Sequence, residues 1–274
     1  MYNRPTMDLP IPPLPASATP PRVMVVVPTY NEVENLSSIV AELLGLDVVG
    51  LHVLIVDDES PDGTGDVADL LCIQHPGRVG VLHRSGERGL GKAYVEGFRR
   101  ALDVGAEFII QMDADFSHSP QVVPVFLTRI ADVDVVVGSR YVAGGELDEH
   151  WSWRRRFLSW GANAAYARIL GMSVRDATGG FKCWRREVLD AIDLSKVRSG
   201  GYVFQVEMAY LAQALGFRVL EIPIHFEDRR IGQSKMSTSV KLEAAWRAWE
   251  IKWRYRHLGG RRRRDASVAA GDDR

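Results

Sequence analysis

Two carboxylates at the end of an apolar run are the side chains of this sequence best suited to chemistry. Asp113 and Asp115 follow residues 108–112, Phe-Ile-Ile-Gln-Met, and precede Phe-Ser-His-Ser-Pro, with one alanine between them. Side chains at positions i and i+2 lie on one face of an extended chain, so both carboxylates can point the same way. In proteins Mg²⁺ or Mn²⁺ is held by one or two carboxylates together with substrate phosphates. The pair therefore suggests a divalent metal that holds a nucleotide diphosphate; the alternative is a solvated turn.

A second acidic pair, Asp57-Asp58, closes another apolar run, residues 51–56. Ligands of open α/β sheets bind at the carboxyl ends of the strands, so the two acidic pairs are expected at one edge of a sheet. One carboxylate could then bond the base or ribose of a nucleotide while the other pair holds the metal. The Pro-Asp-Gly that follows Ser60 also fits an ordinary turn.

Cationic residues follow the other apolar runs. Arg140 comes directly after the run 133–138 and one serine, and its forked guanidinium could bind phosphate oxygens. Residues 86–92, Gly-x-x-x-x-Gly-Lys, nearly match a P-loop. Ala93 stands where the Mg²⁺-binding hydroxyl is required, which favours a tight turn near the site instead.

The polar segment 229–235 contains Arg229, Lys235 and a glycine. A cationic loop of this kind suits a lid that closes over an anionic leaving group. A solvated charge run is the alternative interpretation.

Apolar runs that alternate with helical patterns must position these groups. Continuous apolar runs are typical of strands covered on both faces, and their alternation with helices predicts right-handed crossovers and a mostly parallel sheet. We predict one α/β domain over residues 22–258 that ends in an amphipathic helix. Strands are expected at 23–27, 51–56, 79–82, 108–112, 133–138 and 217–226, a short strand or bend at 178–184, and helices ending near 44, 74, 104, 170, 215 and 257.

The two ends of the chain differ in composition from this domain. Seven prolines fall within residues 1–21, which predicts a disordered or polyproline-like tail. Residues 259–274 contain a run of four arginines and predict a disordered basic tail.

The last predicted helix has an aromatic stripe. Leu242, Trp246, Trp249 and Trp253 recur at helical spacing, with lysines and arginines around them. Such a stripe is most often part of a core, but tryptophans flanked by cations also suit the headgroup region of an anionic membrane. The helix at 154–170, preceded by two tryptophans, is a second candidate for docking on a membrane surface.

Composition limits the classes of protein. The chain has 274 residues, 46% of them hydrophobic, and a net charge of −1, which gives no indication of nucleic acid binding. Its two cysteines lie far apart in sequence and are expected to be reduced. No apolar stretch approaches the ~18 residues of a membrane span, and no signal peptide pattern is present. We therefore expect a cytoplasmic protein that associates peripherally with the cytoplasmic face of a membrane.

Nine short motifs occur in order along the chain. They are Val-Pro-Thr-Tyr-Asn-Glu (27–32), Asp-Asp-x-Ser-Pro-Asp-Gly-Thr (57–64), Gly-Leu-Gly-x-Ala (89–93), Asp-Ala-Asp-x-Ser-His (113–118), Gly-Ser-Arg-Tyr (138–141), Ser-x-Gly-Ala-Asn (159–163), Thr-Gly-Gly-Phe (178–181), Gly-Tyr-Val-Phe-Gln-x-Glu (201–207) and Gly-x-Ser-Lys (232–235). With these motifs the chain resembles the polyprenol (dolichol) phosphate mannose synthases, inverting glycosyltransferases of family 2 with a Rossmann-like GT-A fold, over about residues 22–240. Its lack of a membrane span resembles the type with a separate catalytic subunit, so an integral-membrane partner is a further expectation.

The resemblance implies transfer of mannose from GDP-mannose to a polyprenyl monophosphate, with Mg²⁺ or Mn²⁺ as cofactor. The metal ligands would be Asp113 and Asp115, and with Arg140 these would be the catalytic residues. The acceptor phosphate would meet Arg140, Arg155 and Ser159. The nucleotide sugar would be bound by Pro28, Tyr30, Glu32, Val56, Asp58, Asp113, Ala114, Asp115, Arg229 and Lys235.

Two positions depart from the family pattern. Glu59 replaces a glycine that is usual after the acidic pair, which adds a charge near the base pocket. Ser117 stands where some members carry a glutamine that binds the metal, so water would fill that position.

Other functions remain open at this stage. The nearest is glucosylation of polyprenyl phosphate from UDP-glucose; a non-catalytic nucleotide- or lipid-binding subunit and a P-loop kinase are the others. A phosphate monoester has its second pKa near ~6 and is already an anion at neutral pH, so we expect the acceptor to need guiding cations and no dedicated catalytic base.

Overall fold

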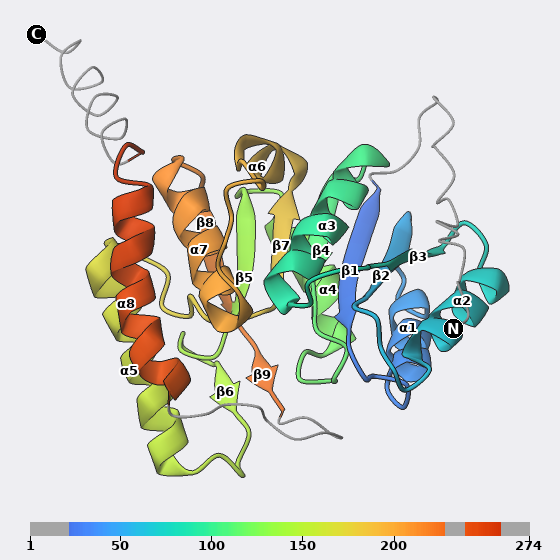
Figure 1. The fold of residues 1–274 in the computed structure, drawn as a ribbon, viewed down its shortest axis with the longest axis horizontal. Coiled ribbons are helices and arrows are strands. Elements are labelled where there is room, and N and C mark those ends of the chain that lie inside the picture. The colour runs from blue at the N-terminus through green and yellow to red at the C-terminus, as the bar shows by residue number, and fades with distance from the viewer. Residues whose placement is uncertain (1–21, 228–238, 259–274) are drawn as a thin grey trace, which may run out of the picture.

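A seven-stranded sheet forms the centre of the computed structural model, in the order β3-β2-β1-β4-β7-β5-β8 (Figure 1). The structure describes residues 22–227 and 239–258, with the backbone alone for 239–245. A second sheet pairs β6 with β9. The strands are β1 Val23–Thr29, β2 Leu51–Asp57, β3 Val79–His83, β4 Phe108–Gln111, β5 Val135–Ser139, β6 Glu146–Leu147, β7 Lys182–Arg185, β8 Val219–Pro223 and β9 His225–Phe226.

One strand of the main sheet runs against the others. β1 to β4 pair in parallel, as do β5 and β8, whereas β7 is antiparallel to both of its neighbours, β4 and β5. Every residue of β1 is buried, which explains its continuous apolar run, because a central parallel strand is covered on both faces. The start of β7 therefore lies beside the ends of β4 and β5.

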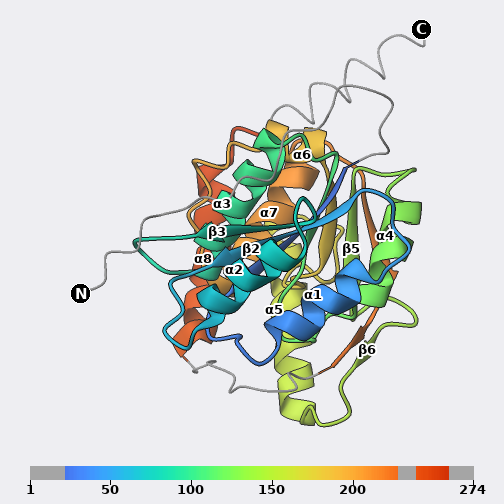
Figure 2. The same cartoon turned by 90° about the vertical axis from the view of Figure 1, so that its right-hand side faces the viewer.

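Helices cover both faces of the main sheet (Figure 2). Side chains of α1, α2 and α4 share one apolar core with the sheet, and those of α3, α5, α6, α7 and α8 share the other. The helices are α1 Leu36–Leu44, α2 Thr64–Gln74, α3 Leu90–Asp103, α4 Val123–Arg129 after a short 3₁₀ turn at Pro120–Val122, α5 Trp153–Leu170, α6 Arg186–Ala191, α7 Gly201–Ala214 and α8 Ser239–Arg254.

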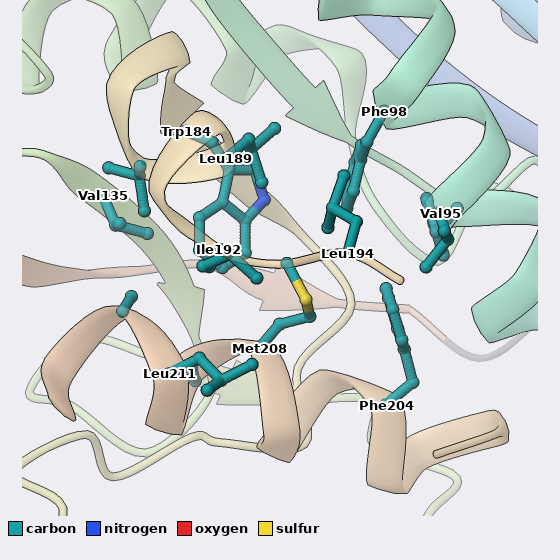
Figure 3. Close-up of a cluster of buried hydrophobic side chains, with 14 of the residues drawn as sticks. Val95, Phe98, Val135, Trp184, Leu189, Ile192, Leu194, Phe204, Met208 and Leu211 are labelled. Carbon is teal, nitrogen blue, oxygen red and sulfur yellow. The ribbon is translucent and has the colours of Figure 1, made fainter. Parts of the chain in front are cut away.

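An aromatic cluster fixes α3 and α7 against the sheet (Figure 3). Phe98 of α3 meets the edge of Trp184 of β7, with ring centroids 6.4 Å apart. Tyr94, one turn earlier on α3, stacks on Phe204 of α7 at 5.7 Å. This packing holds the Tyr94 hydroxyl at the end of the sheet where β4 finishes.

Three features of the second half differ from the sequence prediction. The expected strand 217–226 is divided: β8 stays in the main sheet, and after Pro223, which has no N–H to donate, the chain leaves to pair β9 with β6. The expected strand or bend at 178–184 becomes a strand only from Lys182, and α6 was not predicted.

Within 22–227 and 239–258, no helix is both long and apolar enough to cross a bilayer.

The predicted tails at 1–21 and 259–274, and the cationic segment that contains Arg229 and Lys235, lie outside the described residues.

Candidate active site

The acidic and basic side chains singled out in the sequence lie at the carboxyl ends of three strands of the main sheet. Asp57 is the last residue of β2, Asp113 follows β4 by two residues, and Arg140 follows β5 by one. Since β2 and β4 flank β1 in parallel, and β5 is parallel to β8 beyond the antiparallel β7, their carboxyl ends share one edge of the sheet. The structure thus brings these predicted site residues to one edge, where ligands of open α/β sheets bind.

Asp113 is held by two partners. Tyr94 donates its hydroxyl to Asp113 Oδ1 at 2.7 Å, and the Asp113 N–H donates to His118 Nδ1 at 3.3 Å. Burial, with the nearby Asp113 carboxylate, raises the pKa of Tyr94 well above its usual range. Burial also lowers the pKa of His118, so its ring is neutral and free to accept at Nδ1. The orientation of Asp113 is therefore set by neutral groups that do not compete with a metal for charge.

Asp115 is buried and bonds within its own turn. The Ser117 N–H and hydroxyl donate to Asp115 Oδ1 at 3.1 and 2.6 Å. Phe116 between them adopts the left-handed conformation, with φ of 62°, which closes the turn. Ser117 thus orients a carboxylate in this structure.

The two carboxylates fit a metal that is shared with a substrate. Asp113 and Asp115 supply hard oxygen ligands, and no cluster of three or more His, Cys, Asp or Glu side chains suited to a metal occurs among the described residues. The described residues therefore contain no group of three or more such side chains that could hold a metal by itself. Mg²⁺ and Mn²⁺ suit such a site, because substrate phosphates and water complete their coordination.

The acidic pair at the end of β2, Asp57 and Asp58, already bonds to other groups of the protein. Asp58 pairs with buried Arg84, and the Gly89 N–H donates to Asp58 Oδ2 at 2.7 Å. Asp57 Oδ1 accepts from Thr29 at 3.2 Å and from the Ser60 hydroxyl at 2.6 Å. In residues 86–92, which nearly match a P-loop, the Gly89 N–H thus donates to a carboxylate.

A cationic side chain covers the predicted nucleoside side of the site. Arg88 donates to the Tyr30 hydroxyl at 3.1 Å, and its guanidinium carbon lies 5.0 Å from the centre of the Tyr30 ring. Arg88 also donates to the Glu59 carbonyl at 3.1 Å. Glu59 has a φ of 58°, a conformation that glycine adopts without strain. The departure from glycine at this position therefore puts a side chain on a backbone conformation that favours glycine, and places its carboxylate beside the arginine.

Other predicted nucleotide residues lie in the same strands or in the turns that follow them. Pro28 and Val56 are register partners in β1 and β2. The Glu32 N–H donates to Thr64 Oγ1 at 2.9 Å, and Ala114, which lies between Asp113 and Asp115 in the sequence, is buried. Arg229 and Lys235 cannot be placed, since they lie outside the described residues.

Arg140 is bound to a carboxylate that the sequence analysis did not single out. The Arg140 N–H and Nε donate to Asp176 Oδ2 at 2.9 and 2.8 Å, and Nη2 donates to Asp176 Oδ1 at 2.6 Å. Burial alone would lower the pKa of Arg140, but Asp176 offsets this and leaves that pKa above its ordinary value. Nη2 also donates to Thr178 Oγ1 at 3.0 Å. The guanidinium is thus locked in place and permanently charged.

The two other predicted acceptor residues are on α5. Ser159 accepts from the Tyr141 hydroxyl at 2.7 Å, and the Arg155 guanidinium carbon lies 3.7 Å from the centre of the Trp151 ring. Asn163 of α5 donates to Thr178 Oγ1 at 3.0 Å. These bonds connect α5 to the residues around Arg140.

Four buried residues of the site were missed from sequence: Tyr94, Asp176, Lys182 and Gln205. The signal for two of them is a carboxylate and a lysine on either side of a glycine pair, in Asp-Ala-Thr-Gly-Gly-Phe-Lys at 176–182. Lys182 is fully buried, and burial lowers its pKa to about 7.

Comparison with known proteins assigns the class. Residues 24–193 match the model of glycosyl transferase family 2, and the chain belongs to this family. The polyprenol monophosphomannose synthase of Mycolicibacterium smegmatis is 45% identical over 244 residues, 88% of this chain and 91% of that protein. The undecaprenyl-phosphate mannosyltransferase of Micrococcus luteus is 42% identical over 243 residues, 88% of this chain and 98% of that protein.

Solved structures confirm the fold. Glucosyl-3-phosphoglycerate synthase from Mycobacterium tuberculosis, crystallised with Mn²⁺, UDP-glucose and phosphoglyceric acid, superposes with a TM-score of 0.60 over 84% of this chain and 79% of that chain, at 14% identity. The predicted fold class, a single GT-A domain with a mostly parallel mixed sheet flanked by helices, is therefore confirmed.

Proposed function

We propose that this enzyme transfers mannose from GDP-mannose to a polyprenyl monophosphate, with inversion at the sugar. One observation carries the proposal: two carboxylates suited to a metal and a locked arginine follow β4 and β5, whose carboxyl ends lie at the same edge of the sheet with β7 between them. Relatives over 40% identical along most of the chain are named for mannose transfer to polyprenyl phosphates, which supports this choice of donor sugar and acceptor.

The donor half of the site would use residues at the ends of β1 and β2, in the turns that follow them, and after β4. Pro28, Tyr30, Glu32, Val56 and Asp58 would bind the guanosine, and Asp113, Ala114 and Asp115 would meet the diphosphate. Asp113 and Asp115 would hold Mg²⁺ or Mn²⁺, which stabilises the negative charge of the departing diphosphate when bound. Arg229 and Lys235 would close over this leaving group from the segment outside the described residues.

The acceptor half of the site would use Arg140, Arg155 and Ser159. A phosphate monoester is already an anion at neutral pH, since its second pKa is near ~6, so no side chain needs to remove a proton. Arg140 donates from Nε and Nη2 to Asp176 and Thr178, which leaves Nη1 to bind a phosphate oxygen. These cations would let an anionic acceptor approach an anionic donor without repulsion.

A donor panel tests this function. GDP-mannose, GDP-glucose and UDP-glucose are offered separately with polyprenyl phosphate and either Mg²⁺ or Mn²⁺, and the sugar that enters the organic phase is measured. We expect mannose from GDP-mannose, with inverted configuration in the product, and loss of transfer when a chelator is added. Transfer of glucose from UDP-glucose would instead select the alternative glucosyltransferase, and binding without transfer would indicate a non-catalytic subunit.

Helices α5 and α8 lie side by side (Figure 1), and both expose aromatic side chains that suit a membrane surface. Trp246, Trp249 and Trp253 of α8 are 72%, 56% and 68% exposed, because Ala248 and Ile251 take the packed face of that helix. Cations lie over these rings, with Lys252 Nζ 5.6 Å from Trp249 and the Arg256 guanidinium carbon 4.8 Å from Trp253.

The adjacent helix continues this surface. On α5, Trp153, Phe157 and Trp160 are also exposed. Arg154 lies over the Trp153 ring. Aromatic rings among cations suit the headgroups of anionic lipids, so we propose that α5 and α8 dock the enzyme on the cytoplasmic face of the membrane, beside its lipid substrate. Stable anchoring usually takes more than one signal, which is why an integral-membrane partner is part of this proposal.

Vesicle binding checks the docking surface. Replacing Trp246, Trp249 and Trp253 together with serine should weaken binding to anionic vesicles by at least about 10-fold, equivalent to about 1.4 kcal/mol. The same change at Ile73, an exposed side chain of α2, serves as the control and should have no effect. Equal binding of the triple variant and wild type in a sedimentation assay would contradict the role given to α8.

A further inference from the structure

A lysine with no solvent exposure lies between the two charged groups of the site. Lys182 begins β7, where it is the register partner of Gln111 in β4 and of Val137 in β5. β4 leads to the carboxylates of the proposed metal site, and β5 leads to Arg140. The lysine thus occupies the one strand that separates the donor half from the acceptor half.

Two glycines shortly before Lys182 lie close to both halves. A Cβ atom at Gly180 would lie 3.2 Å from Asp113 Oδ2, and a Cβ atom at Gly179 would lie 3.4 Å from Asp176 Oδ1. Consecutive residues therefore lie against the carboxylate of the proposed metal site and the carboxylate that locks Arg140. A shift of this glycine pair would move the Asp113 carboxylate relative to the Asp176 carboxylate.

The Lys182 ammonium holds this glycine pair in place. Its Nζ donates to the Gly179 carbonyl, and to Gln205 Oε1 of α7 at 3.0 Å. Gln205 Oε1 also accepts from Gln111 Nε2, so the same oxygen connects α7 to β4. Four segments, β4, the glycine pair, β7 and α7, are thereby joined beneath the reacting groups.

Stability alone does not account for a lysine at this position. A buried ammonium is costly because it leaves water, whereas an apolar side chain of similar volume packs at no such cost, and such replacements are often neutral or stabilising. The low pKa of Lys182 reflects this cost of burial. What the lysine supplies is two directed hydrogen bonds that a methionine lacks.

We propose that Lys182 is a positioning residue for the transfer step: it fixes the glycine pair so that the metal carboxylates and the Arg140–Asp176 pair keep the separation that transfer requires. This inference rests on the function proposed above, which assigns donor and acceptor to the two halves. It predicts that the loss of Lys182 impairs the geometry of the reacting groups, and not the binding of either substrate.

Replacement of Lys182 by methionine tests the inference. We expect kcat to fall about 10²-fold, the loss that a misplacement of about 1 Å can cause. KM for donor and acceptor should stay within about threefold, and the thermal midpoint should not fall. Cys183→Ala is the matched control: Cys183 is the next residue of β7, is equally buried and packs in the apolar core on the other face of the sheet, so it should keep its kcat. Gln205→Leu, which removes one of the two acceptors of Lys182, should give the same division between kcat and KM.

A second measurement separates this inference from the proposed function. With Mn²⁺ and GDP bound, the relaxation of the ³¹P signal of a short-chain prenyl phosphate reports the distance from the metal to the acceptor phosphorus. Lys182→Met should still bind both ligands but show a changed distance. An unchanged distance, or a kcat within about threefold of wild type, would overturn the inference. A wild-type protein that binds both ligands but transfers no sugar would refute the proposed function and leave this distance as the test of Lys182.

Discussion

Asp115→Asn is expected to lower kcat/KM by at least about 10³-fold, equivalent to about 4 kcal/mol of transition-state stabilisation. The asparagine retains an oxygen that can accept from the Ser117 N–H and hydroxyl, which donate to Asp115 Oδ1 at 3.1 and 2.6 Å. The turn should therefore survive while one negative ligand of the proposed metal is lost. Steady-state kinetics with Mn²⁺ varied should show that residual activity needs a higher Mn²⁺ concentration for half saturation, and the thermal midpoint should stay near that of wild type.

Asp132→Asn is the control for this experiment. Asp132 is an exposed carboxylate in the turn before β5, at the opposite edge of the sheet from the site. Its replacement should leave both activity and metal dependence unchanged. If Asp115→Asn kept more than a tenth of the wild-type kcat/KM, the assignment of Asp115 as a metal ligand would be wrong.

Asp176→Ala should produce the second large effect, on stability and activity together. Arg140 is buried and donates three of the four hydrogen bonds described above to this carboxylate. Removal of one partner of a buried ion pair typically costs about 3–5 kcal/mol, because a buried charge is left without compensation. Urea denaturation should show a loss of this size, and transfer activity should be lost even where the variant is folded.

A double variant then separates the structural role of Arg140 from its proposed role in binding. Arg140→Met combined with Asp176→Leu removes both charges, and an apolar pair of similar volume can restore most of the stability. We expect the double variant to regain stability and to remain inactive, with a raised KM for the acceptor phosphate in any residual activity. Recovery of wild-type activity would mean that Arg140 only stabilises the fold.

The fold of the first half could be predicted because its strands are buried on both faces. Such strands are continuous apolar runs, and the runs at 23–27, 51–56 and 79–82 fall within β1, β2 and β3. The short elements of the second half could not be found in this way. β6 and β9 contain two residues each, too few for any periodicity, and they form because the chain leaves the main sheet after Pro223.

The candidate site could be predicted only where its residues end parallel strands. Asp113 and Arg140 were recognised because each follows an apolar run. Asp176 and Lys182 were not, because their importance depends on β7 being inserted antiparallel between β4 and β5, which no local pattern indicates. The tryptophans of α8 show the same limit: their spacing fits a core as well as a surface, and only packing against α5 and α7 decides which face is buried.

The most direct test of the account is a crystal structure of the protein with GDP and Mn²⁺. One Mn²⁺ ion is expected, bound by Asp113, Asp115 and the diphosphate, with the guanine on the side of Tyr30. A diphosphate held elsewhere, such as against the turn at 86–92 with no contact between the metal and Asp115, would contradict it.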